Sequence, residues 1–210
     1  MSNNTDSNDT AARHKIKMGK RKALQDSKVA SKTIEKGLLM VHTGKGKGKS
    51  TAAFGLALRM LGRGKGVGVV QFIKGSWSTG EQQSLTALAN TGLAPLLWYS
   101  MGEGFTWETQ DRERDIAAAT AAWLKVKELM DNPEIQLLIL DELNIALRYD
   151  YLPLDEIIAD LSARRPELHV VVTGRNAKSA LCDIADLVTE MTLIKHHFAA
   201  GVKAQEGIEF

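Results

Sequence analysis

A glycine- and lysine-rich turn constrains the possible folds of this chain more than any other feature of its sequence. The turn, TGKGKGKST at 43–51, follows the apolar run LLMVHT at 38–43 and leads into STAAFGLALRMLG at 50–62, which has helical periodicity. A strand, a turn ending in Gly-Lys-Ser and a helix together form a P-loop. The strict pattern has Gly at the place of Thr43, so this turn is a variant. The alternative is a glycine-rich turn that binds no ligand.

The residue types of the turn suit a nucleoside triphosphate. Glycines let successive backbone N–H groups surround phosphate oxygens without side-chain clashes, and the helix N-terminus adds a partial positive charge. The Lys49 ammonium can contact the phosphates, and the Ser50 hydroxyl can ligate Mg²⁺. We therefore predict that ATP or GTP contacts Thr43, Gly44, Lys45, Gly46, Lys47, Gly48, Lys49, Ser50 and Thr51.

Short apolar runs alternate with helical segments from Gly37 onward, and several runs are apolar throughout, as in a parallel sheet covered on both faces. We expect strands at 38–43, 67–73, 93–99, 137–142, 168–174 and 186–194, and helices at 50–62, 79–90 and 108–131. The alternation predicts the α/β class. It is typical of a doubly wound, mostly parallel sheet of about six strands, in a P-loop nucleotide-binding domain of the RecA-like kind over residues 37–210.

Two carboxylates end the apolar run LLILDE at 137–142. An unpartnered carboxylate is costly at the end of a buried strand, and ligands bind at the carboxyl ends of such strands. A metal ion held by nucleotide phosphates would offset that cost, so we predict that Asp141 and Glu142 join Ser50 as metal ligands. The alternative is that one of the two carboxylates caps the following helix.

Residues 1–36 form a polar N-terminal arm with nine Lys/Arg and four Asp/Glu, whereas residues 37–210 have eighteen and twenty-one. Residues 1–10 contain no hydrophobic side chain after Met1, which predicts disorder. Residues 11–36 fit either a solvated basic tail or a lid helix that needs a partner surface. The mildly acidic body argues against a nucleic-acid-binding function.

The remaining composition indicates where the protein works. The single cysteine, Cys182, excludes an internal disulfide framework and points to a reducing compartment. No apolar run approaches the roughly 18 residues of a membrane span, and the polar N-terminus lacks the layout of a secretory signal. We therefore expect a cytoplasmic protein with no membrane association.

Several stretches go beyond a generic nucleotide-binding fold. They are VVQFIKGSWSTGE at 69–81, GFTWETQDRERD at 104–115, LDELNIALRYDYLPLDEI at 140–157 and KHHFAAGVKAQEGIEF at 195–210. Together with the turn and its helix they closely resemble the P-loop type of corrinoid adenosyltransferase, the cob(I)alamin family, over essentially residues 35–210. That family shows the same variant at Thr43.

The resemblance implies that ATP and a cobalt corrinoid are the substrates. Co(I) of the reduced corrinoid attacks the 5′ carbon of ATP and expels inorganic triphosphate. Charge then develops along the whole phosphate chain, and Lys45, Lys47 and Lys49 with Mg²⁺ on Ser50 would neutralise it. The alternative for Lys45 and Lys47 is solvent exposure.

The resemblance also assigns a role to Phe105 and Trp107 in GFTWET. They would displace the axial ligand of Co(II) and keep the pocket dry, which eases reduction to Co(I). The alternative is that both are core aromatics that anchor a loop. The resemblance further implies a homodimer, and we expect an electron-donating flavoprotein or free reduced flavin to supply the electron.

Other assignments depend on position alone. Arg59 would reach the nucleotide or merely flank its helix, and Arg175, after the fifth strand, would touch ribose or phosphate. Two rival functions use the same turn: a P-loop ATPase anchored on nucleic acid by the basic arm, and a small-molecule kinase. The product formed from ATP separates them, because only adenosyl transfer releases triphosphate.

Overall fold

The computed structural model describes residues 4–73, 79–101 and 111–209, and Phe105 and Trp107 therefore lie outside the described residues. The chain forms two compact units, Met1–Glu35 and Lys36–Phe210. In its described residues the second unit contains six strands: β1 Leu39–Thr43, β2 Gly66–Gln71, β3 Leu96–Ser100, β4 Ile135–Asp141, β5 His169–Thr173 and β6 Leu187–Glu190. Its helices are α2 Lys49–Leu61, α3 Gly80–Ala89, α5 Arg112–Asp131, α6 Leu143–Arg148, α7 Leu154–Ala163, α8 Ser179–Ile184 and the 3₁₀ helix η1 His197–Ala200.

The strands form one sheet in the order β3-β2-β4-β5-β1-β6, and each of its five pairings is parallel. This confirms the predicted α/β class and the sheet of about six strands. The carboxyl ends of all six strands therefore lie along one edge of the sheet. β5 separates the P-loop strand β1 from the acidic strand β4, which places the end of β5 between the phosphate turn and Asp141.

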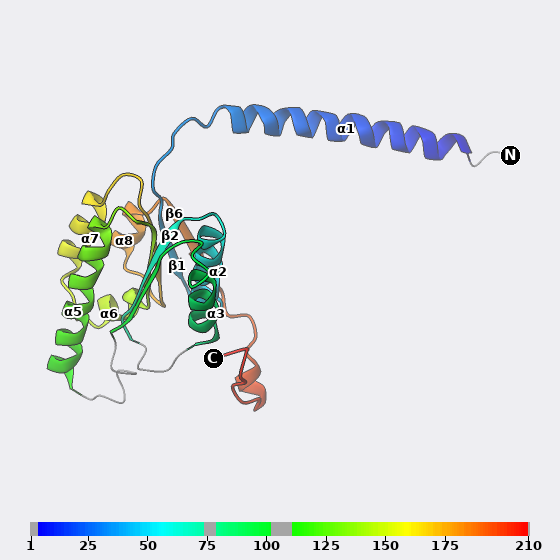
Figure 1. Cartoon of the computed structure of the whole chain (residues 1–210). Helices are drawn as coiled ribbons and strands as arrows, with labels where there is room; N and C mark the ends of the chain where they lie inside the picture. The colour runs from blue at the N-terminus through cyan, green and yellow to red at the C-terminus, as the bar shows by residue number, and fades with distance from the viewer. Residues whose placement is uncertain (1–3, 74–78, 102–110, 210) are drawn as a thin grey trace. The chain divides into compact units, whose positions relative to one another are not determined.

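Helices cover both faces of the sheet (Figure 1). Side chains of α5, α6, α7 and α8 pack on one face, against strand residues such as Val41 and Leu140. Side chains of α2 and α3 pack on the other, against Met40 and Ile139. Alternate residues of one strand thus enter opposite cores, which explains why the strands are apolar throughout. The short helices α6, α7 and α8 were not predicted from the sequence.

The first unit contains the helix α1, Asn4–Ala30. The helix begins within the segment 1–10 for which the sequence predicts disorder. No proline interrupts residues 1–36, so a helix nucleated in the Ala- and Lys-rich part can extend toward the N-terminus. Lys22 and Asp26 form an i,i+4 pair at 2.6 Å. Among the described helices, none is long and apolar enough to cross a bilayer.

Candidate nucleotide-binding site

The phosphate turn follows β1 directly and ends where α2 begins, at Lys49. Gly44 and Gly48 have φ values of 97° and 101°, in the left-handed region that favours glycine. The Gly46 amide donates to the Met191 carbonyl at 2.7 Å. A Cβ on Gly44 would lie 2.4 Å from that same oxygen. The turn therefore needs glycines both for its own backbone conformation and because the chain after β6 packs directly against it.

Lys49 lies inside the turn, only 7% exposed, and its Nζ donates to the Gly46 carbonyl at 2.5 Å. Burial lowers the pKa of this lysine, Glu142 opposes the shift, and the positive charges of Arg175 and Lys47 add to it. Glu142 and Arg175, from distant parts of the sequence, and Lys47, from the same turn, thus act on one ammonium group. Such a group gains more from an anionic ligand than a solvated lysine does.

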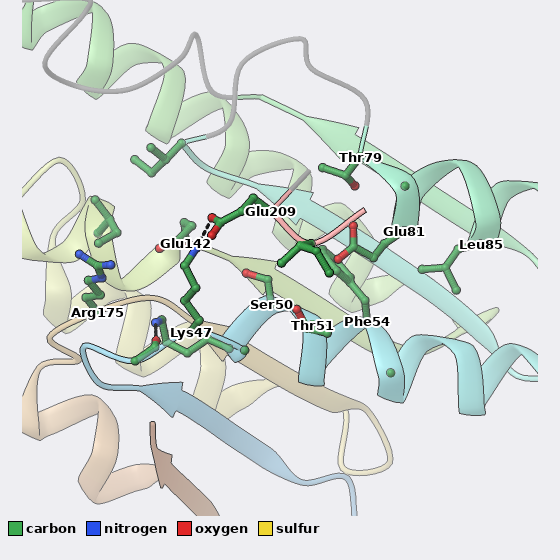
Figure 2. A pocket seen from close by; sticks show the side chains of 18 of the residues that line it. Lys47, Ser50, Thr51, Phe54, Thr79, Glu81, Leu85, Glu142, Arg175 and Glu209 are labelled. Atoms are coloured by element: carbon green, nitrogen blue, oxygen red, sulfur yellow. Dashed lines mark hydrogen bonds and ion pairs between the residues drawn. The ribbon is translucent and has the colours of Figure 1, made fainter. Parts of the chain in front are cut away.

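A cavity of about 780 Å³ opens beside the turn. Figure 2 shows the side chains that line it, among them Ser50, Thr51, Glu81 and Arg175. The turn and α2 form one wall, α3 another, and the segments after β4 and β5 and the end of the chain complete it. Its volume is in the range of small-molecule and cofactor sites.

The two carboxylates after β4 have different environments. Asp141 is fully buried, accepts hydrogen bonds from Gln71 Nε2 at 2.9 Å and Thr173 Oγ1 at 2.8 Å, and does not line the cavity. Glu142 does line it. Within the described ranges, no three His, Cys, Asp or Glu side chains are grouped to hold a metal ion. Of the three predicted metal ligands, Ser50 and Glu142 therefore line the cavity, whereas Asp141 does not.

The structure brings together only part of the predicted nucleotide contacts. The cavity is lined by Gly46, Lys47, Gly48, Lys49, Ser50, Thr51 and Arg175. Thr43, Gly44, Lys45 and Arg59 do not line it. The Thr43 hydroxyl instead accepts from the Ala177 amide at 3.0 Å, which is a structural contact. Lys45 is exposed, as its alternative predicts, and Arg59 is exposed on the last turn of α2, far from the phosphate turn along the helix.

Sequence reasoning assigned no role to several residues that line the cavity. Arg148 and Tyr149 come from α6 and its end, and the Arg148 guanidinium lies 5.5 Å from the Tyr149 ring centre. Glu209 pairs with Lys47 and receives a second contact from His197 Nε2 at 3.1 Å. The hydrogen bond from Lys47 lowers the pKa of Glu209 below its usual range. The motifs RYDY and GIEF belong to the stretches that carry the family resemblance, but no local sequence pattern predicts that these segments contact the phosphate turn.

Comparisons with known proteins agree with the site. Residues 35–210 match the family described as ATP:corrinoid adenosyltransferase BtuR/CobO/CobP, and residues 2–29 match the family described as Cob(I)alamin adenosyltransferase N terminal. A corrinoid adenosyltransferase of Pseudomonas aeruginosa is 51% identical over 94% of this chain and 96% of its own length. Its counterpart from a Sinorhizobium species is 52% identical over 95% and 92%. Corrinoid adenosyltransferase CobA of Salmonella typhimurium is 46% identical over 94% and 98%. This chain belongs to the ATP:corrinoid adenosyltransferase family.

Proposed function

We propose that this protein transfers the 5′-deoxyadenosyl group of ATP to the cobalt of a reduced Co(I) corrinoid in adenosylcobalamin formation. The electron pair of Co(I) forms the carbon–cobalt bond at C5′, the C5′–O bond breaks, and its electron pair leaves with inorganic triphosphate. The convergence of Lys47, Lys49 and Arg175 on one cavity carries the proposal. Family membership supports it independently.

The chain's own residues serve the leaving group. When triphosphate departs as one unit, negative charge grows on its oxygens, and preorganised cations lower the barrier most. The hydrogen bond to the Gly46 carbonyl orients Lys49 within the turn, so little reorganisation is needed. Lys47 and Arg175 extend the positive region along the cavity, and the α2 N-terminus adds its partial charge.

The residues present fit a magnesium ion bound together with ATP. Mg²⁺ commonly takes one or two protein oxygens, with phosphates and water supplying the rest. Ser50 and Glu142 line the cavity and would hold the ion, whereas Asp141 is occupied by its two neutral donors. The ion would supply additional positive charge to the phosphates.

Further parts of the proposal come from the family resemblance. Phe105 and Trp107 would displace the axial ligand of Co(II), and a flavoprotein or free reduced flavin would supply the electron. The N-terminal arm would fold over the corrinoid as a lid. We also propose a homodimer, and a cytoplasmic location, which is supported by the single cysteine.

Anaerobic incubation with ATP, Mg²⁺ and chemically reduced cobalamin tests the function. The expected products are a light-sensitive adenosylated corrinoid and an equal amount of triphosphate. Lys49→Ala serves as the matched variant and should lose most of both. Release of phosphate would indicate an ATPase instead, and ADP with a phosphorylated acceptor would indicate a kinase.

A further inference from the structure

A network of hydrogen bonds crosses the carboxyl edge of the sheet from β3 to β5; its two bonds to Asp141 are buried and the others are partly buried. Ser100 Oγ and Trp98 Nε1 donate to Gln71 Oε1 at 2.8 and 3.1 Å. Gln71 Nε2 donates to Asp141 Oδ2 at 2.9 Å, and Thr173 Oγ1 donates to Asp141 Oδ1 at 2.8 Å. The last bond of this network is donated by the Glu142 amide to Thr173 Oγ1, at 3.0 Å. Four strands therefore meet in one network.

The direction of every bond in this network follows from donor and acceptor chemistry. The Trp98 indole can only donate, so the oxygen of the Gln71 amide faces Trp98 and the nitrogen faces Asp141. A carboxylate can only accept, so Thr173 gives its single hydroxyl proton to Asp141. The Thr173 oxygen is then available to accept from the Glu142 amide. Neither Gln71 nor Thr173 can reverse its orientation without breaking a buried hydrogen bond to Asp141.

The network ends on a residue that lines the nucleotide cavity. Glu142 has φ 63° and ψ 21°, a left-handed conformation that is uncommon for residues other than glycine, asparagine and aspartate. Its amide is held by Thr173, which is fully buried. The backbone conformation decides where the side chain of Glu142 begins, and Figure 2 shows this side chain beside the phosphate turn.

We propose that Gln71, Asp141 and Thr173 are positioning residues that set Glu142 toward the ATP-bound magnesium ion, and that Asp141 is not itself a metal ligand. This proposal rests on the proposed function in one respect, namely that Glu142 is a ligand of the magnesium ion bound together with ATP. It differs from the sequence-based prediction, which made Asp141 and Glu142 equivalent ligands. The strand order explains the difference, because β5 places Thr173 next to Asp141 and β2 places Gln71 on its other side.

The decisive variants are Thr173→Val, which removes both bonds at nearly constant volume, and Thr173→Ser, which keeps the hydroxyl. Binding of a non-hydrolysable ATP analogue is titrated at a series of Mg²⁺ concentrations by calorimetry. Mg²⁺ should strengthen binding of the analogue, and Thr173→Val is expected to raise the Mg²⁺ concentration for half of this effect about tenfold. A loss of this size is usual when a residue that hydrogen-bonds a metal ligand is removed. Analogue affinity without Mg²⁺ should change less than about twofold, and Thr173→Ser should restore the Mg²⁺ response.

Thr189→Val on the exposed strand β6 is the matched control for a threonine-to-valine change in this sheet. A thermal midpoint for each variant shows whether it is folded at the assay temperature. Combining Thr173→Val with Glu142→Gln should add little to the Mg²⁺ shift of Glu142→Gln alone, because both changes act on the same ligand. Asp141→Asn should raise the Mg²⁺ concentration needed for half-maximal strengthening of analogue binding by less than Glu142→Gln does.

Three results would overturn the proposal: an unchanged Mg²⁺ response in folded Thr173→Val, additive shifts in the double variant, or a larger shift for Asp141→Asn than for Glu142→Gln. These readouts need no corrinoid. Failure of adenosyl transfer with normal Mg²⁺-ATP binding would therefore refute the proposed function and leave the positioning network standing.

Discussion

Replacing Lys49 by Met should stabilise the folded protein while it removes most of the adenosylation activity. Lys49 is almost fully buried, and burial lowers its pKa from the ordinary value of 10.5. The folded chain therefore carries a charge at neutral pH that would be better solvated in the unfolded chain. Met has a similar length and no charge, so the substitution relieves that cost.

The size of the effect follows from two opposing contributions. Removing the buried ammonium relieves a desolvation penalty of several kcal/mol, part of which the attraction of Glu142 already offsets. The lost hydrogen bond to Gly46 opposes this by about 1 kcal/mol, because Gly46 lines the cavity and water can replace the ammonium. We expect a net gain of about 1–2 kcal/mol at pH 7, which for a chain of this size raises the thermal midpoint by about 4 °C. Adenosylation should fall about 10²–10³-fold.

The pH dependence has a definite sign. Between the lowered folded-state pKa of Lys49 and 10.5, the unfolded chain binds more protons than the folded chain, so the wild-type protein gains stability as pH rises. Below this window both states are protonated and the penalty is complete. Above it both are neutral and the penalty is gone. The advantage of Lys49→Met should therefore be largest near pH 7 and shrink toward pH 10.5.

Urea unfolding of the wild type and Lys49→Met at pH 7 and pH 10, together with the anaerobic triphosphate assay, checks both parts. Lys45→Met is the stability control, since this exposed lysine lies in the same turn and should change the free energy of unfolding by less than about 0.5 kcal/mol. The reasoning fails if Lys49→Met is less stable than the wild type at pH 7, or if its advantage does not change with pH.

Four further changes test other parts of the molecule. Phe105→Ala or Trp107→Ala should reduce turnover from Co(II) corrinoid far more than turnover from prepared Co(I); equal losses in the two assays would favour a packing role. Deleting residues 1–32 should weaken corrinoid use, seen as a raised corrinoid KM, and leave ATP binding nearly unchanged; a normal KM would refute the lid. Gly44→Ala should cost at least about 2 kcal/mol in urea unfolding, because the backbone is left-handed and the Met191 carbonyl oxygen lies only 2.4 Å from the Cβ position. Gly55→Ala on α2 has open space around the Cβ position and should gain up to about 1 kcal/mol. Glu209→Gln should tighten triphosphate binding about two- to fivefold in calorimetry, because Lys47 loses a competing partner; unchanged binding would show that the pair does not oppose the ligand.

The strands and the phosphate turn could be predicted because their causes are local. Continuous apolar runs and the Gly-Lys-Ser sequence reflect backbone preferences and burial over a few neighbouring residues. The helices α6 and α8 were missed since each has only six residues, too few for a clear period. The helical start of the arm at Asn4 was missed because helix propagation depends on residues farther along the chain.

The sequence by itself determined the α/β class, the P-loop and the family, whereas only the tertiary structure decided which of the predicted residues share the cavity. Asp141 and Glu142 are adjacent in the sequence, yet Gln71 and Thr173, far away along the chain, hold one of them and leave the other facing the phosphate turn. Glu209 reaches Lys47 from the other end of the domain. Local patterns encode which backbone a segment adopts, but strand order and long-range packing decide which side chains meet.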